Sequence, residues 1–218
     1  MREDDITGSI PPRIKIRGIL ETIMKKFSKE EAKFLAIIFI ILLLMVLINF
    51  RTSFRKARDA QRKGDVETVI NGLEDGFFKN FGYFPLSSPD GKMLACKGPN
   101  TKYGEKEAKF INLIACEWGK DALMDLFDPN FPAFISTLPK DPQTAKRISY
   151  QYFSNGKRFQ ILVSLEGKTE AEYNQQIETR GINCGARLCN YGKAFSNTSV
   201  YQTIDEYEKK LLRNNNGQ

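Results

Sequence analysis

The sequence predicts an α+β fold in which a long N-terminal membrane-spanning helix continues into an amphipathic helix that packs on a small antiparallel sheet. Three observations predict it. Residues 34–50 are almost entirely apolar, residues 66–81 carry apolar side chains at helical spacing, and residues 148–165 alternate apolar and polar side chains around an Asn-Gly pair. The 218 residues suffice for one globular domain of ordinary size and an N-terminal appendage.

The apolar run is the candidate membrane span. Residues 34–48 contain no polar side chain, and Phe50 extends the run to the short end of the lengths that cross a bilayer. Lys33 and Arg51 bracket the run, where both side chains can reach lipid headgroups. A buried helix of a soluble domain is the alternative, but such a helix would normally have a polar face.

The start of this helix is also marked in the sequence. Ser28 and Glu31 have the spacing of a capping box, in which each side chain binds the backbone amide of the other. A cleaved secretory signal is a second alternative, but the apolar run follows 33 mostly polar residues and no small-x-small cleavage site comes after it. We expect a retained anchor that begins near residue 28.

The positive charge of the chain is unevenly distributed. The net charge of +7 divides into +2 over residues 1–33, +5 over residues 51–63 and zero over residues 64–218. A domain that grips nucleic-acid phosphates concentrates cations on itself, so this distribution disfavours nucleic acid as a partner. It predicts membrane lipid as a partner, bound by a basic collar that flanks the membrane and consists of Arg51, Arg55, Lys56, Arg58, Arg62 and Lys63.

Four cysteines, Cys96, Cys116, Cys184 and Cys189, all follow the apolar run. Their even number predicts two disulfides in an oxidising compartment, and pairing of 96 with 116 and of 184 with 189 closes the shortest loops. Free thiols or a zinc site with four thiolates are the alternatives, although the spacing lacks two close pairs. We therefore expect a single-pass membrane protein with a cytoplasmic N-terminus and an extracytoplasmic C-terminal domain.

The chain divides into five parts on this interpretation. They are a cytoplasmic segment at 1–33, the span at 34–50, an amphipathic helical extension at 51–85, the extracytoplasmic domain at 86–213 and a disordered tail at 214–218. The helical extension is expected to end near Phe81, before Tyr83-Phe84-Pro85.

Within the domain, Gly, Pro, Ser and Lys predict a loop over 86–105, and apolar spacing favours one or two short helices over 105–127. A β-hairpin is predicted over 148–166, with Asn155-Gly156 at its turn. A second capping box at 169–172 favours a short helix there, and a final amphipathic helix contains Ile204 and Leu211.

Catalytic and cofactor motifs give no signal. The chain has no histidine, which excludes Ser-His-Asp and Cys-His catalysis and imidazole metal sites. No Walker loop or G-x-G-x-x-G fingerprint occurs. We expect a protein that is not an enzyme and uses no cofactor or metal ion.

Four short motifs in order resemble type IV pilins and the pseudopilins of type II secretion. Residues 56–65 read KARDAQRKGD, similar to the KARDA-x-RK-x-D stretch after the membrane helix of many pilin-like proteins. Residues 80–85 read NFGYFP, and 138–142 read LPKDP with YQY at 150–152, as in the major pseudopilin group. The resemblance covers about residues 34–166.

This resemblance implies a non-enzymatic subunit of a pilus, pseudopilus or secretion assembly that acts by contacts with pilin-like or secretion proteins or with further copies of itself. Phe27 and Glu31 have the spacing of the residues after a prepilin cleavage site, with Lys26 where that site has glycine. They form a degenerate prepilin-like site in which Glu31 is more simply explained as a helix cap.

Two other functions fit the same sequence. One is a stand-alone envelope protein whose outer domain binds a ligand or the cell wall. The other is a membrane-anchored hydrolase with a Ser-Lys or paired-carboxylate site, which would show a lysine or acid of shifted pKa in a deep cleft.

Overall fold

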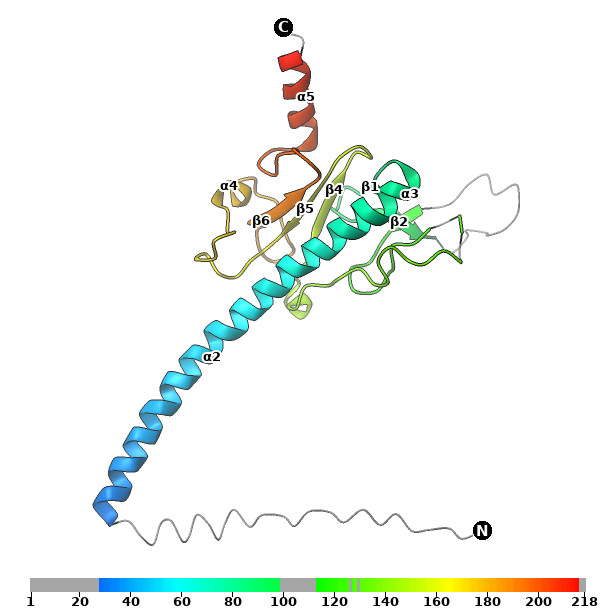
Figure 1. Cartoon of the computed structure of the whole chain (residues 1–218). Helices are drawn as coiled ribbons and strands as arrows, with labels where there is room; N and C mark the ends of the chain where they lie inside the picture. Colours follow the sequence, from blue (N-terminus) through cyan, green and yellow to red (C-terminus); the bar gives the residue numbers. More distant parts are fainter. Residues whose placement is uncertain (1–27, 99–112, 126, 129, 216–218) are drawn as a thin grey trace, which may run out of the picture. The chain divides into compact units, whose positions relative to one another are not determined.

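The computed structural model describes residues 28–98, 113–125, 127, 128 and 130–215, and it has an α+β fold. The chain forms two compact units, residues 1–52 and 53–218, each of which is described by itself. Within the second unit, short strands lie beside the C-terminal part of the first helix (Figure 1). Phe27 and most of the predicted cytoplasmic segment lie outside the described residues.

The first helix, α2, covers Lys29–Asn71 and continues without interruption through the π-helical η1 (Gly72–Phe78) into α3 (Lys79–Phe81). Its start has the predicted capping box, since the Ser28 amide donates to Glu31 Oε2 at 2.8 Å and the Glu31 amide donates to Ser28 Oγ at 3.3 Å. Gly82 follows α3 with a φ of 75°, a left-handed conformation that ends helices and favours glycine. The predicted end near Phe81 is confirmed.

The helix buries one apolar face in the domain core. Val66, Val69, Leu73 and Phe77 recur at spacings of three and four and are at most 6% exposed. They belong to the same core cluster as Tyr152, Phe159 and Ile161 of the sheet described next. The amphipathic pattern of residues 66–81 is therefore a packing face.

Two three-stranded antiparallel sheets complete the core. One has the order β1 (Leu86–Ser87), β2 (Met93–Lys97) and β3 (Leu113–Ala115), and the other has the order β4 (Gln151–Ser154), β5 (Phe159–Val163) and β6 (Tyr191–Ala194).

The first sheet corrects two expectations. The loop predicted over 86–105 contains strands β1 and β2, and residues 113–115 form a strand where a helix was predicted. Cys116 lies beside β3, where its amide donates to the Met93 carbonyl at 2.8 Å. Pairing with β2 decides the conformation of residues 113–115, and a segment of three residues is too short to show a helical or alternating pattern in the sequence. Residues 105–112 lie outside the described residues.

The predicted hairpin is β4 and β5, joined by residues 155–158. Gly156 has a φ of 86°, and Asn155 Oδ1 accepts from the amides of Lys157 and Arg158. Alternate residues of β5 point to opposite faces, so Phe159, Ile161 and Val163 join the helix-facing core. Leu162, on the other face, belongs to a second core with Ile177, Cys184 and Cys189.

The chain after residue 167 covers this second face. Helix α4 (Gln175–Glu178) begins at Asn174, whose side chain accepts from the Gln176 amide. The helix predicted from the capping box at 169–172 is wrong, because these residues form turns. The predicted final helix is α5 (Ile204–Asn215), which extends past the expected tail boundary at 214.

Candidate functional site

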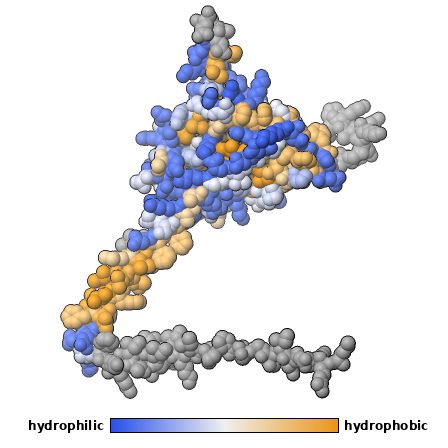
Figure 2. All heavy atoms as spheres, viewed as in Figure 1, coloured by the Kyte–Doolittle hydropathy of each residue, from blue (hydrophilic) through white to orange (hydrophobic). Residues whose placement is uncertain are grey.

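The apolar half of α2 is exposed in the first unit. The large apolar side chains from Phe34 to Leu47 are between 46% and 67% exposed, and Figure 2 shows them as a hydrophobic surface on this part of the helix. A soluble domain does not leave so continuous an apolar surface in water. The helix near the N-terminus is long and apolar enough to span a membrane.

A buried ionic cluster lies where the same helix meets the domain. The Arg62 guanidinium donates from Nε to Asp141 Oδ2 at 2.6 Å and from Nη2 to Asp141 Oδ1 at 3.0 Å. Its Nη1 donates to Asp59 at 2.8 Å and to Glu166 at 3.0 Å. Arg58 adds a second two-point contact to Glu166, at 2.5 and 2.7 Å. These five residues are called the Arg62 cluster below.

Three members of the Arg62 cluster are completely buried. The side chains of Arg62, Asp59 and Asp141 are 0% exposed. Burial lowers the Arg62 pKa, but the hydrogen bonds and charge of Asp141 outweigh it and the pKa is raised. Hydrogen bonds from Arg58 are the main reason that the pKa of Glu166 is lowered to about 2. Arg62 and Glu166 are therefore both charged at neutral pH.

Asp59 ties the helix to the backbone after β5. Its carboxylate accepts from the amides of Glu166 at 2.8 Å and Gly167 at 2.9 Å. Residues 58–62 of the helix thus supply two cations, Arg58 and Arg62, and one anion, Asp59, to the loop at residues 166 and 167.

These contacts remove Arg62 from the predicted basic collar and pair two of its other members with acidic residues. Arg62 faces the protein interior and cannot contact lipid headgroups, Arg58 is paired with Glu166, and Lys63 donates to Glu172 at 3.0 Å. The cause is helical geometry, since positions 59 and 62 share the face that continues to Val66 and Val69. Arg51 and Lys56 are exposed and Arg55 is half-buried, so a role at the headgroups remains a prediction for these three.

Two tyrosines extend the contacts of the motif residues. The Tyr150 hydroxyl donates to Asp65 at 2.5 Å, and the Tyr152 hydroxyl donates to the Pro85 carbonyl at 2.7 Å. Burial raises the pKa of Asp65 and of Tyr150. Hydrogen bonds therefore link each quoted motif to at least one other, and the pair of Asp65 and Tyr150 is 85 positions apart in the sequence.

Both disulfides are present with the expected pairing. Cys96 is bonded to Cys116, and Cys184 to Cys189. The first cross-links β2 to the residue after β3 and lies in the helix-facing core, whereas the second lies in the core on the opposite face of β5.

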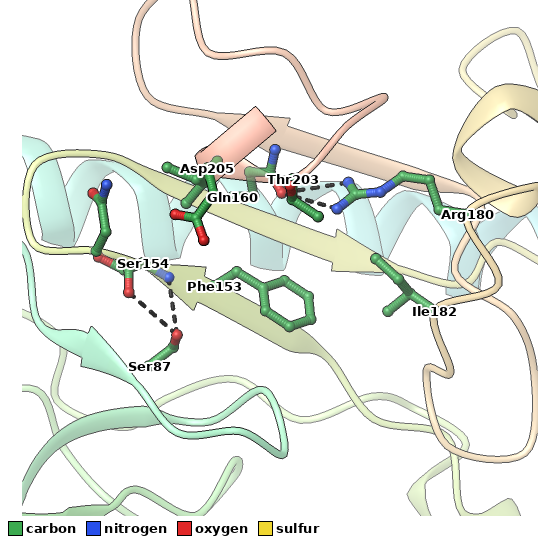
Figure 3. A pocket seen from close by; sticks show the side chains of 10 residues that line it. Ser87, Phe153, Ser154, Gln160, Arg180, Ile182, Thr203 and Asp205 are labelled. Carbon is green, nitrogen blue, oxygen red and sulfur yellow. Dashed lines mark hydrogen bonds between the residues drawn. The ribbon is translucent and has the colours of Figure 1, made fainter. Parts of the chain in front are cut away.

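A pocket of about 360 Å³ lies between the β4–β5 hairpin and the start of α5 (Figure 3). Phe153 and Ile182 form an apolar wall, while Arg180 and Asp205 contribute opposite charges. The Arg180 guanidinium donates to Gln160 Oε1 at 3.3 Å and to the Val200 carbonyl at 2.5 Å. Both acceptors are neutral, and burial lowers the Arg180 pKa. Nothing in the sequence pattern singles out this arginine.

The geometry supplies no metal centre in the described part of the chain, where no group of three or more acidic or cysteine side chains is placed to hold an ion. Comparison of the chain with protein-family models, curated proteins and solved structures gave no match.

Proposed function

We propose that the chain is a non-enzymatic, membrane-anchored subunit of the pilin and pseudopilin type, which acts through protein contacts in a type IV pilus or type II secretion assembly. The helix of residues 34–50 anchors it, and its domain is extracytoplasmic. The N-terminus is cytoplasmic.

The convergence of the motifs is the observation that carries this proposal. Motifs matched by chance would have no reason to touch one another in the folded chain. Arg62 of KARDAQRKGD binds Asp141 of LPKDP at two points, and Asp65 of the first motif accepts from Tyr150 of YQY. Tyr152 binds Pro85 at the end of NFGYFP. Arg62 and Asp65 thus fasten the helix to the segments of two later motifs, and Tyr152 holds the chain that follows the helix.

The two disulfides support an extracytoplasmic domain, because structural disulfides persist in oxidising compartments. The exposed apolar helix supports contacts with other membrane helices, since association in lipid proceeds through direct packing.

Site-specific photo-cross-linking in native membranes tests the proposal. A photoreactive phenylalanine analogue replaces Leu43, in the apolar part of α2, and adducts are identified by mass spectrometry after irradiation. The proposal expects protein adducts with membrane helices of an envelope assembly, or with a second copy of the chain. The matched control carries the analogue at Lys157, an exposed hairpin residue. Adducts with lipid alone, and no co-purifying envelope proteins, would contradict the proposal.

The intact mass of the purified chain separates two versions of the function. A mature chain that begins at Phe27 supports assembly into a filament after processing. A chain that keeps residue 1 on every molecule contradicts the filament and leaves a fixed, anchored subunit.

A stand-alone envelope protein that binds a ligand is the second candidate. The pocket with Arg180 favours it, because a half-buried arginine held by neutral acceptors can still bind an anion. It predicts a monomer with no co-purifying pilus or secretion proteins in the same cross-linking experiment.

A further inference from the structure

The pocket between the β4–β5 hairpin and the start of α5 contains two opposite charges, neither of which forms an ion pair with a described residue. It is called the Arg180 pocket below. The charges are the Arg180 guanidinium and the Asp205 carboxylate, and Figure 3 shows both among the side chains that line the pocket. Its volume of about 360 Å³ is near the lower end for small-molecule sites, which begin at about 300 Å³. The pocket therefore suits a small ligand.

Gln160 positions Arg180. The Gln160 side chain is fully buried, and its Nε2 donates to the backbone carbonyls of Ser199 at 2.5 Å and Gln202 at 2.8 Å. Gln160 Oε1 then accepts from both Nη atoms of Arg180, at 3.3 Å each, and Nη1 also donates to the Val200 carbonyl. The guanidinium is therefore positioned before any ligand binds, which reduces the entropy lost on binding.

Arg180 keeps hydrogen-bond donors for a ligand. A guanidinium has five N–H donors, and these contacts use three of them. Nε donates to no described atom, and it is not among the described polar atoms that are both buried and without a partner, so it is open to solvent. Burial lowers the Arg180 pKa, but an arginine stays charged in proteins. A partly exposed cation with unused donors is thus available to an anionic group.

Asp205 is the second charge in the pocket. It lies in the first turn of α5, it is exposed, and its carboxylate makes no hydrogen bond or ion pair with the described residues. Its acidic neighbours are engaged, since Glu206 exchanges two hydrogen bonds with Thr203 and Glu208 accepts from Asn155. Asp205 is therefore the carboxylate available to a cationic group in the pocket.

The apolar wall of the pocket rests on a core. Phe153 and Ile182 line the pocket, and both pack against the buried cluster that contains Leu162 and Ile177. Each is half-buried, so each keeps apolar surface that a ligand can cover. Covering such surface favours a ligand with an apolar group.

We propose that the Arg180 pocket binds a small zwitterion with an apolar side chain, which is an apolar amino acid or a short peptide. Its carboxylate accepts from Arg180, its ammonium donates to Asp205, and its apolar group packs on Phe153 and Ile182. No ion pair joins the two charged residues, so a ligand that carries both charges can complement each of them. A simple anion or cation would be attracted by one of the two charges and repelled by the other.

This proposal rests on the ligand-binding role of the second candidate function and supplies the class of ligand for it. It does not depend on assembly into a pilus or secretion system. Cross-linking at Leu43 reports on the assembly and a titration reports on the pocket, so failure of one is distinguishable from failure of the other.

Calorimetric titration of the full chain in detergent, with both disulfides intact, tests the proposal. The probes are leucine, leucinamide, which lacks the carboxylate, 4-methylpentanoate, which lacks the amine, and the dipeptide dileucine. The better of the two zwitterions is expected to bind at least about tenfold more tightly than either analogue with one charge. Leucine binding at least as tightly as dileucine identifies a free amino acid as the ligand, and weaker binding identifies a peptide; both outcomes support the proposal.

The variant Asp205→Asn separates binding from folding. The side chain is exposed and unpaired, so the substitution should change the melting temperature little. The variant should lose the preference for the zwitterion over 4-methylpentanoate, because the amine then has no carboxylate partner. Arg180→Gln should weaken binding of the zwitterion by about tenfold, with Arg180→Lys between it and the parent. The control Asp75→Asn removes an exposed carboxylate outside the pocket and should bind like the parent.

Three results would overturn the proposal. They are no binding of either zwitterion at millimolar concentration, equal binding of a zwitterion and a one-charge analogue to the parent chain, and an undiminished preference for the zwitterion over 4-methylpentanoate in Asp205→Asn.

Discussion

At the scale of single residues, Arg62 of the helix joins three acidic side chains. Its side chain is fully buried and is the common partner of Asp59, Asp141 and Glu166. Removing one member of a buried ion pair is costly, because it leaves the opposite charge uncompensated in a medium that solvates it poorly.

We predict that Arg62→Ala lowers the free energy of unfolding by about 4 kcal/mol. Chemical denaturation of the full chain in detergent measures this. Lys56→Ala removes an exposed cation from the same helix and should change stability by less than about 0.5 kcal/mol. Similar losses in the two variants would mean that Arg62 is not buried as described.

The lowered pKa of Glu166 predicts a loss of stability in acid. Its pKa is about 2 in the folded chain, against an ordinary value of 4.5. A carboxylate whose pKa is lower in the folded than in the unfolded chain stabilises the fold at pH values above its unfolded pKa. This stabilisation, about 3 kcal/mol, is lost as the pH falls from about 4.5 to about 2. Glu166→Gln should be less stable at pH 7 and should lose less stability over that interval. Melting temperatures measured across the interval test this, and identical slopes for parent and variant would refute it.

Sequence reasoning could identify Arg62 and Asp141 as motif residues but could not pair them. The pair joins positions 79 apart, and Glu166 joins Arg62 across 104 positions. In the sequence alone, a stretch rich in lysine and arginine beside an apolar run indicates side chains that face lipid headgroups. Arg62 points inward because it shares a helix face with Val66 and Val69. Which face of the helix is buried depends on how the sheet docks against it.

At the scale of elements, the π-helical segment η1 brings two glycines against the loop that contains Phe134 and Ile135. A methyl group added at Gly72 would lie 2.3 Å from Ile135 Cγ1, and one added at Gly76 would lie 2.8 Å from Phe134 Cδ1. Glycine disfavours a helix, so its presence here is explained by close packing.

We predict opposite effects of alanine at two glycines of this continuous helix. Gly72→Ala should destabilise by about 2 kcal/mol, because it crowds the buried Ile135 side chain. Gly64→Ala should stabilise by about 1 kcal/mol, since no atom lies within 4 Å of the added methyl. Denaturant titrations of both variants measure the difference. Stabilisation by both would show that the Ile135 loop is not packed on the helix.

Elements with strong local patterns were predictable. The hairpin has seven well-placed apolar side chains and a glycine turn, and the capped start of α2 depends only on Ser28 and Glu31. Strands β2 and β3 were missed because each is short and is held by its partner and by a disulfide. Helix α4 begins at Asn174. The capping box at 169–172 is more conspicuous in the sequence, but these residues form turns in which the Gly167 carbonyl accepts from the Glu170 amide.

At the scale of the whole molecule, the placement of the two termini across a membrane is the open prediction. With the N-terminus in the cytoplasm and the domain outside, a cysteine at Lys157 should react with a membrane-impermeant maleimide in spheroplasts. A cysteine at Ser9 should react only after lysis. The four native cysteines are paired and should stay unlabelled without reductant. Labelling at position 9 in intact spheroplasts, with protection at position 157, would show that the N-terminus is outside and the domain inside.

The pocket beside β5 has no signature in the sequence. Gln160 lines it, and Leu162, two positions later in β5, belongs to the core on the face opposite to α2. The chain after residue 167 covers that face, and its path depends on a short disulfide loop and several turns.

The Arg62 cluster also bears on how the protein carries mechanical load. A force applied to the N-terminal part of α2 reaches the domain through the contacts of the helix. Among the described residues, the first ion pairs of α2 after residue 50 are those of Arg58, Arg62 and Lys63 with Glu166, Asp141 and Glu172. They precede Val66 and Val69 in the chain, so a load from the N-terminal side meets these ion pairs before it meets the apolar contacts.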